Sequence, residues 1–329
     1  TRAEPGRPVL CAAVEHSAVR AASLRRGAVI TVPVDRQGRI DAAFVATAVT
    51  APVAAPPAAA SPAAAAPVAA ALDDGGLDDG TGRARARPPG ARPALVNCQW
   101  ANHEVGTVQP VADVVAACRA AGVLVHVDAA QAAGHLPVAL DALGADLVSV
   151  SAHKFGGPPG TGALVVRRGL RIPPFIVGGE QERARRGGME NVAAIAGFGV
   201  AAEAAASSLA HEGDAARRQT AALLEAALAV PGVVAYGDPA GRAPHIVCVG
   251  VEGVEAEAVL LGLDQAGIAA HSGSACSSEA LEPSPVLDAM GVDAERSLRL
   301  SVGWSTTDAD IAAFASAFPG VVARLRALR

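Results

Sequence analysis

The stretch VLVHVDAAQAAG, residues 123 to 134, joins a run of apolar β-type residues to a run of small residues, and Asp128 stands where the apolar run ends. Further apolar runs of this kind lie at 28–34, 94–100, 147–152 and 162–168. Helical patterns near 110–121 and 189–210 separate or follow these runs. Continuously apolar strands that alternate with helices are typical of a mainly parallel sheet covered on both faces. The sequence therefore predicts an α/β fold whose ligand binds at the carboxyl ends of the strands.

The pattern changes near residue 209, where a long helix with a polar face is expected at 212–229. The remaining elements are strands near 232–236 and 244–250 and helices near 254–267, 283–291 and 306–325. We therefore predict two domains, a large one at 1–208 and a smaller C-terminal α+β domain at 209–329.

Residues 51–93 differ from the rest of the chain, because they are rich in Ala and Pro and poor in large apolar side chains. Repeated prolines break helices, and such a composition cannot form a core. We expect a disordered surface insertion. The sequence DDGGLDDG at 73–80 lacks the alternating oxygen ligands and closing Glu of a calcium loop, which favours a solvated loop.

The composition excludes some function classes. With 51% hydrophobic residues, a formal net charge of -5 and no basic block, the chain is expected to be a globular protein that does not bind nucleic acid directly. Interrupted apolar runs and the lack of a signal-peptide layout predict no membrane span. No metal-ligand spacing occurs among the cysteines, and their odd number suits a reducing compartment such as the cytoplasm. Cys11, Cys98, Cys118 and Cys248 are expected in the core, whereas Cys276 is expected to be exposed.

Lys154, in SAHKFGGPPGTGAL at 151–164, is the only lysine in a sequence whose Lys and Arg residues number 27. Arginine stays protonated, but a lysine can lose its proton and form a Schiff base with a carbonyl. The alternative is a surface lysine kept by chance. Lys154 follows an apolar strand and precedes a glycine-rich turn, which favours a reactive role.

Asp128 ends the strand before that of Lys154, and Gln131 follows three residues later. Taken alone, Asp128 is more simply a helix cap. Paired with a Schiff-base lysine, it suits the acid that keeps the ring nitrogen of pyridoxal phosphate protonated. Both residues are expected at the same edge of the sheet.

Seven motifs follow one another along the chain: VEHSAV (14–19), NHEVGTVQP (102–110), HVDAAQ (126–131), SAHKFGGPPGTGAL (151–164), GGEQERARRGG (178–188), SGSACSS (272–278) and LRLSVG (298–303). In these motifs and their order the chain resembles the cysteine desulfurases, pyridoxal-phosphate enzymes of the class V aminotransferase group with fold type I. Together the motifs span nearly the whole chain and are far more specific than any one of them.

The resemblance implies a role for each matching residue. Lys154 would bind the cofactor aldehyde, Asp128 its ring nitrogen and Gln131 its phenolic oxygen. Ser151 and His153 would bind the phosphate. His16 would stack on the ring and assist proton transfer, Arg299 would bind the substrate carboxylate, and Cys276 would be the nucleophile.

The implied activity is removal of sulfur from L-cysteine, which leaves alanine and a persulfide on Cys276. The Gly/Ser sequence around Cys276 suits a loop that carries sulfur to an acceptor. The expected partners are a second copy of the chain and an iron–sulfur scaffold or another acceptor, such as one for tRNA thiolation.

The chain departs from the family pattern at three places. The family's phosphate-binding turn precedes the first matching motif, so we expect an N-terminally truncated sequence. His103 replaces an asparagine that contacts the cofactor, and Met189 replaces a threonine that contacts phosphate in the neighbouring subunit. Two alternatives stay open: a selenocysteine lyase or another class V lyase, and a catalytically impaired fragment or non-enzymatic sulfur-trafficking partner.

Overall fold

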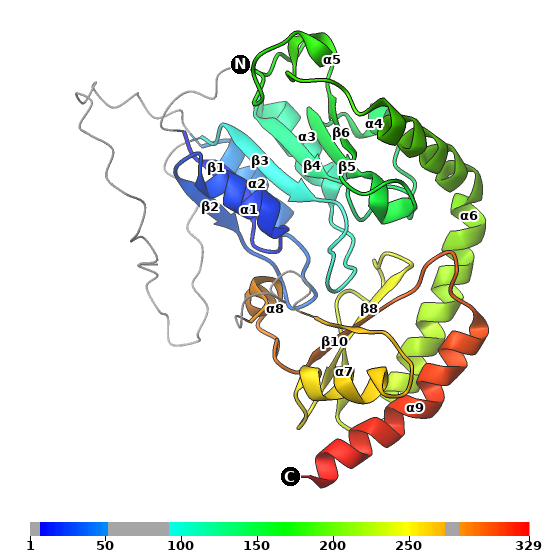
Figure 1. Ribbon diagram of the computed structural model, residues 1–329. Helices are drawn as coiled ribbons and strands as arrows, with labels where there is room; N and C mark the ends of the chain where they lie inside the picture. The colour runs from blue at the N-terminus through cyan, green and yellow to red at the C-terminus, as the bar shows by residue number, and fades with distance from the viewer. Residues whose placement is uncertain (1–6, 52–91, 274–282, 329) are drawn as a thin grey trace.

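The computed structural model describes residues 7–51, 92–273 and 283–328, which form two sheets with flanking helices (Figure 1). The larger sheet has the strand order β2-β1-β3-β4-β5-β6. Its strands are β1 (Val9–Ala12), β2 (Val29–Val32), β3 (Leu95–Gln99), β4 (Leu124–Asp128), β5 (Leu147–Ser151) and β6 (Gly162–Val166). Neighbouring strands run parallel except β6, which is antiparallel to β5. The predicted α/β fold with a mainly parallel sheet is confirmed.

The helices of this unit begin and end at residues suited to those positions. They are α1 (Ser17–Leu24), α2 (Ala42–Val49), α3 (Val111–Ala121), α4 (Leu140–Leu143), the 3₁₀ helix η1 (Ala152–Phe155) and α5 (Gln181–Ala184). Asp41 caps α2 by accepting a hydrogen bond from the Phe44 amide at 2.9 Å. Gly122 ends α3 in the left-handed conformation, with φ of 63°. Helices α2 and α3 pack against each other, and α3 packs against β3 and β4.

The core of the larger unit is built from the apolar runs that predicted the strands. Leu10, Val96, Val125 and Val127 have at most 1% of their surface exposed. Cys11, Cys98, Cys118 and Cys248 are buried and free, as expected from their apolar surroundings.

The smaller sheet has the order β7-β8-β10-β9, and its strands pair antiparallel. Its strands are β7 (Val233–Tyr236), β8 (Ile246–Val251), β9 (His271–Ser272) and β10 (Ser297–Ser301). The helices of this part of the chain are α7 (Ala256–Asp264), α8 (Pro285–Met290) and α9 (Asp308–Ala327). Phe314 and Phe318 of α9 stack at 4.9 Å within a second hydrophobic core.

One helix, α6 (Val192–Leu228), replaces the two helices expected at 189–210 and 212–229. No proline interrupts this Ala-rich stretch, so helix propensity continues through the change from apolar to polar composition. Its contacts extend from η1 to α9, and in Figure 1 it runs along both units. The predicted division after residue 208 therefore falls inside a helix.

Helix α8 also crosses that division. Val286, Leu287 and Met290 are buried in the hydrophobic core of the larger unit, although their positions follow residue 209. The end of the chain thus stabilises both cores, and the domain boundaries given above stay a prediction.

By length and composition, α6 could cross a membrane. It contains an 18-residue window with a mean hydropathy of 1.6, none of which is buried in the structure. Glycine and charged residues interrupt this run, which is why the sequence predicts no membrane span. One such helix is weak evidence for a span, and the expected absence of a membrane stays a prediction.

The predicted insertion at 51–93, with its DDGGLDDG segment, lies almost wholly outside the described residues.

Candidate active site

Asp128 lies where β4 ends, and it pairs in the parallel ladder with Ser149 of β5. Its Oδ1 accepts a hydrogen bond from the Ala130 amide at 3.0 Å and lies 3.3 Å from the Ser149 Oγ. Within the described part of the chain both contacts end on Oδ1, which leaves Oδ2 for a ligand. Asp128 therefore stabilises a turn after β4, where the simpler interpretation expected a helix, and it still presents a carboxylate oxygen.

Lys154 lies in η1, directly after β5, and its side chain is exposed. Because β4 and β5 are parallel, their ends meet at one edge of the sheet and bring Lys154 to the side of Asp128. The turn behind it requires glycine, since a Cβ on Gly162 would approach the Val150 carbonyl oxygen to 2.6 Å. The Ser151 Oγ and the His153 Nδ1 are 2.9 Å apart, so the two predicted phosphate ligands lie together.

Gln131 is held by a residue of the smaller sheet. Its Oε1 lies 3.1 Å from the His245 Nε2, which precedes β8. The His245 ring stacks on His135 at 3.6 Å, and the His135 Nε2 lies 3.0 Å from the Lys154 carbonyl oxygen. The two histidines therefore connect the backbone of Lys154 to the side chain of Gln131.

Burial lowers the pKa of both stacked histidines. The pKa of His245 falls well below its usual value because of its burial, and the charges of His135, Arg299 and Lys154 lower it further. Burial likewise lowers the pKa of His135. Both rings are therefore neutral at neutral pH, and His245 can donate its Nε2 proton to the Gln131 oxygen. This would turn the amide nitrogen of Gln131 toward a ligand.

His16 begins α1, and its Nδ1 accepts a hydrogen bond from the Ala18 amide at 3.2 Å. His16 is therefore the N-cap residue of α1. Its ring meets the edge of the His103 ring at 5.0 Å. The Arg299 Nη1, on β10, donates to the His103 carbonyl oxygen at 3.0 Å. His103 therefore lies between His16 of the larger unit, predicted to stack on the cofactor ring, and Arg299 of the smaller unit, predicted to bind the substrate carboxylate.

Sequence reasoning assigned no role to several polar residues near the site. They are Glu15, Glu104, His126, His135, Ser149, His245 and Ser284. Glu104 is buried and accepts a hydrogen bond from the Ser284 hydroxyl, which also caps α8. The sequence signal for such residues is a polar residue within an apolar run, as His126 in VLVHVD.

Cys276 lies outside the described residues, within 274–282. The other four cysteines are poor nucleophiles, because burial raises the pKa of Cys11 and Cys118 to about 12 and of Cys98 and Cys248 well above the usual value. Among the described residues, no three His, Cys, Asp or Glu side chains form a metal site.

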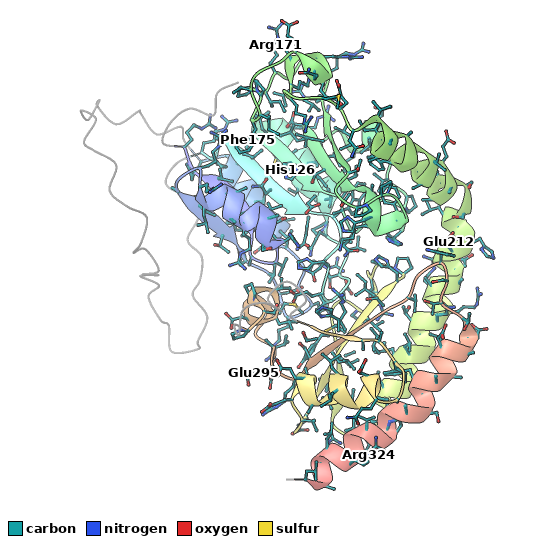
Figure 2. All side chains as sticks on the ribbon, in the orientation of Figure 1. His126, Arg171, Phe175, Glu212, Glu295 and Arg324 are labelled. Atoms are coloured by element: carbon teal, nitrogen blue, oxygen red, sulfur yellow. The ribbon has the colours of Figure 1, made fainter. Side chains whose placement is uncertain are left out.

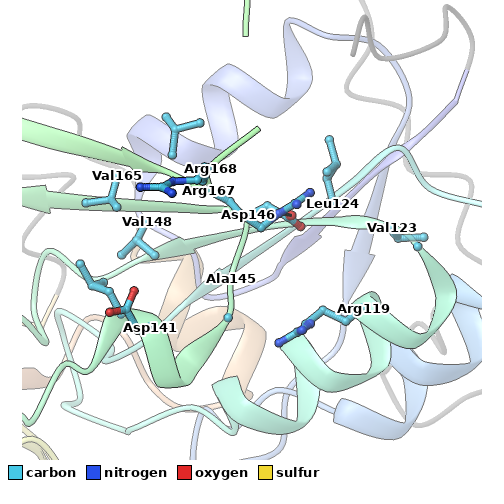
Figure 3. Close-up of a pocket in the computed structure, with 14 residues that line it drawn as sticks. Arg119, Val123, Leu124, Asp141, Ala145, Asp146, Val148, Val165, Arg167 and Arg168 are labelled. Carbon is cyan, nitrogen blue, oxygen red and sulfur yellow. Dashed lines mark hydrogen bonds and ion pairs between the residues drawn. The ribbon is translucent and has the colours of Figure 1, made fainter. Parts of the chain in front are cut away.

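A cavity of about 590 Å³ lies at the opposite edge of the larger sheet (Figure 3). It is lined by Leu124, which begins β4, and by Asp146, which accepts from the Arg167 Nε at 2.6 Å. Asp128 ends the same strand, so this cavity is separate from the predicted catalytic residues.

Comparison with known proteins gives consistent matches. The family model for aminotransferase class-V matches residues 88–314. A cysteine desulfurase of Gluconacetobacter diazotrophicus is 44% identical over 242 residues, which cover 71% of this chain and 60% of the relative. A cysteine desulfurase of Archaeoglobus fulgidus is 40% identical and covers 71% of this chain and 62% of the relative. The chain thus spans about three fifths of these relatives.

The fold also matches solved structures. A NifS-like protein from Rickettsia africae superposes with a TM-score of 0.77 at 26% identity, covering 96% of this chain and 75% of that one. DndA from Streptomyces lividans gives a TM-score of 0.65 at 30% identity, covering 90% and 74%. The expected fold type I is confirmed by these matches together with the six-stranded sheet.

Proposed function

We propose, from the premise that this chain belongs to the aminotransferase class-V family, that it is a cysteine desulfurase which removes the sulfur of L-cysteine. One observation carries the proposal: the only lysine of the sequence lies in the turn after β5, at the sheet edge where Asp128 ends β4. Relatives that are 40 to 44% identical bear the name of this activity, which supports the choice of substrate.

The enzymes of this family use pyridoxal phosphate. The donor set of this chain fits that cofactor: an amine for its aldehyde, a carboxylate oxygen for its ring nitrogen, an amide for its phenolic oxygen, and the Ser151–His153 pair for phosphate. The cofactor, when bound, supplies an electron sink for the bonds at the substrate Cα.

The residues of the chain would divide the remaining tasks. The Asp128 carboxylate would hold a proton at the ring nitrogen, and the Gln131 amide, oriented by His245, would donate to the phenolic oxygen. The Lys154 amine would move protons at the substrate Cα. His16 would stack on the cofactor ring and assist proton transfer, and the Arg299 guanidinium would bind the substrate carboxylate.

The sulfur transfer itself would use Cys276. Its thiolate attacks the sulfur of L-cysteine, the bond between that sulfur and the substrate Cβ breaks, and a proton replaces the sulfur on carbon. L-cysteine and the Cys276 thiol thereby give L-alanine and a Cys276 persulfide, with atoms and electrons balanced. The acceptor that removes the persulfide sulfur is proposed to be an iron–sulfur scaffold or a tRNA-thiolation protein.

The test incubates the protein with pyridoxal phosphate and L-cysteine and measures alanine, with sulfide measured after a thiol reductant is added. Lys154→Ala should abolish the absorbance of the bound cofactor. It should also lower the rate of alanine release by roughly 10²- to 10⁴-fold, as expected for loss of a positioned acid–base group. Cys276→Ala should keep the bound absorbance and release no sulfide. Bound cofactor without alanine or sulfide would contradict the proposal.

The same assay separates the two alternatives. A selenocysteine lyase would act on selenocysteine in the Cys276→Ala variant while remaining inactive on cysteine. A non-enzymatic sulfur-trafficking protein would show no bound absorbance at any cofactor concentration.

We further propose that the protein acts as a homodimer in the cytoplasm. Apolar side chains exposed around Phe175 and Met189, which are 95% and 88% exposed, support this, because association would bury them. The cytoplasmic location is supported by the four free cysteines, which suit a reducing compartment.

A further inference from the structure

A chain of polar side chains crosses the larger sheet and ends at Asp128. It begins at Ser23 of α1 and continues through Asn97 of β3, His126 of β4 and Ser149 of β5, each within hydrogen-bond distance of the next. His126 lies among the strands of the larger unit (Figure 2). Such a series of side chains can transmit a change of protonation, because a hydroxyl or a neutral imidazole donates one proton in one direction, whereas an imidazolium donates from both ring nitrogens.

The Ser23 end of this series of side chains determines the direction in which its hydrogen bonds are donated. The Ser23 hydroxyl donates its one proton to the Val19 carbonyl oxygen at 2.8 Å, so it accepts from the Asn97 amide nitrogen at 2.9 Å. The Asn97 carbonyl oxygen therefore faces the His126 Nδ1, at 3.0 Å. Since that oxygen only accepts, the His126 Nδ1 must carry a proton.

At the Asp128 end, the direction in which the Ser149 hydroxyl donates depends on the charge of His126. When the ring is neutral, its Nε2 is an acceptor and takes the Ser149 proton at 3.0 Å, so this proton points away from Asp128. When the ring is a cation, its Nε2 donates to the Ser149 Oγ. The Ser149 proton is then released to the Asp128 Oδ1, which is 3.3 Å away.

We propose that His126 is a positioning residue that sets, through Ser149, how many hydrogen bonds the Asp128 carboxylate receives. A neutral His126 leaves the Ala130 amide as the donor to Oδ1, so that the carboxylate shares its charge with one hydrogen-bond donor fewer. A carboxylate in that state holds a proton on the ring nitrogen of pyridoxal phosphate most firmly. The role at the cofactor rests on the proposed function, but the state of His126 does not.

The surroundings of His126 favour the neutral ring. The groups that face it are Asn97 on β3, Ser149 on β5 and, two residues along its own strand, Asp128. Behind Asn97 lies Ser23, beside the buried thiol of Cys11. Burial lowers the pKa of His126, and the charge of Asp128 opposes this without reversing it.

The first experiment measures ¹⁵N shifts of the histidine rings in the protein without cofactor, with His126 assigned by the loss of its signals in His126→Gln. We expect a neutral ring protonated at Nδ1 at pH 7.5. Ser23→Ala frees Asn97 to turn over and should increase the population protonated at Nε2. A cationic ring, or one protonated at Nε2 in the unmodified protein, would overturn the proposal whether or not the protein is a desulfurase.

The second experiment uses Asn97→Asp, which places a carboxylate against Nδ1. This should raise the pKa of His126 by roughly 1 to 3 pH units, because an opposite charge at contact stabilises the cation. The ¹⁵N shift of ring-labelled pyridoxal phosphate, measured at the same pH, should then move toward the unprotonated value. Adding Ser149→Ala should diminish this movement, since the hydrogen-bond link is gone.

An equal movement with and without Ser149 would mean that His126 acts only through space, and would overturn the role of Ser149. Failure of the labelled cofactor to bind would count against the proposed function. The ¹⁵N shifts of the His126 ring would still show its protonation state and so test the proposal. Where Asn97→Asp fails to fold, Ser149→Ala alone provides the test. Because a neutral His126 already turns the Ser149 proton away from Asp128, the shift of the bound ring nitrogen should stay unchanged and Nδ1 of His126 should stay protonated. A clear movement of the ring-nitrogen shift in this variant would mean that Ser149 donates to Asp128 beside a neutral ring, and would overturn the proposal.

Discussion

Glu15 is a carboxylic acid buried under the candidate active site, with 1% of its surface exposed. Its Oε1 accepts a hydrogen bond from the Gln99 amide at 2.6 Å, and its Oε2 has no hydrogen-bond partner among the described residues. Burial raises its pKa to about 8, and the nearby charge of Asp128 adds to the increase. At neutral pH the folded protein therefore holds Glu15 as the neutral acid, whereas the unfolded chain releases that proton.

This difference predicts a pH dependence of stability. The free energy of unfolding should fall as pH rises from about 4.5 to about 8, because the unfolded state binds fewer protons over that range. Glu15→Gln keeps an acceptor for Gln99 and removes the titration. Thermal melts at pH 5.5 and 8.5 should show a smaller decrease of Tm in this variant than in the unmodified protein. Equal decreases in both would contradict the prediction, and Glu203→Gln, on the exposed surface of α6, is the control.

At the scale of the elements, the β5–β6 hairpin and α6 use glycine in opposite ways. Gly162 begins β6, where a Cβ would lie 2.6 Å from the Val150 carbonyl oxygen of the paired strand. Gly199 lies inside α6, where a Cβ would meet no atom within 4 Å. The first glycine is required for the turn that presents Lys154, whereas the second only weakens its helix.

The two glycines should therefore respond to alanine with opposite signs. Gly162→Ala should destabilise the protein by about 1 to 3 kcal/mol, as overpacking against fixed backbone does. Gly199→Ala should stabilise it by roughly 0.5 to 1 kcal/mol through helix propensity. Urea denaturation measures both effects. An unchanged free energy of unfolding in Gly162→Ala would contradict this prediction, because it would mean that β6 can move away from β5 without loss of stability.

At the scale of the whole molecule, apolar side chains remain exposed between β6 and α6. Phe175, Val177 and Met189 are each more than three quarters exposed, and the Gly187 amide donates to the Ile176 carbonyl oxygen at 2.7 Å, which brings the two segments together. Val192, at the start of α6, extends this patch. Surfaces of this kind usually mark an interface.

We expect this patch to form part of the proposed homodimer interface. Replacing Phe175 and Val177 together with serine should weaken dimerisation by roughly tenfold or more, because buried anchors each contribute more than about 1 kcal/mol. Analytical ultracentrifugation measures the dissociation constant. Trp304→Ser, which alters another exposed apolar residue, should leave it unchanged. A protein that stays monomeric at all concentrations would exclude the dimer.

Contacts of the candidate site could be predicted where the two residues lie on consecutive strands, but not where they are far apart in the sequence. Asp128, Ser151 and Lys154 could be placed together from the sequence, because consecutive parallel strands bring their carboxyl ends to one edge. The partner of Gln131 could not, since His245 lies 114 positions away. Nothing local to either residue indicates that the two meet.

The elements show the same limit. Strongly apolar runs such as 94–100 and 123–128 were predicted close to their observed bounds in β3 and β4. Strand β1 and helices α1 and α2 were not predicted, because their sequence patterns are short and weak. The single helix α6 was predicted as two, because the change of composition near residue 209 reflects a change of neighbours rather than an end of the helix.

By itself, the sequence determined the class of fold, and it predicted the reactive lysine and the aspartate that ends the preceding strand. Periodicity and the chemistry of single side chains are local properties, so they can be read without coordinates. Only the tertiary structure decided that His126 connects Asn97 to Ser149, that His245 holds Gln131, and that the Arg299 guanidinium reaches the His103 carbonyl. These contacts join distant segments whose meeting depends on how the two sheets pack, which no local pattern specifies.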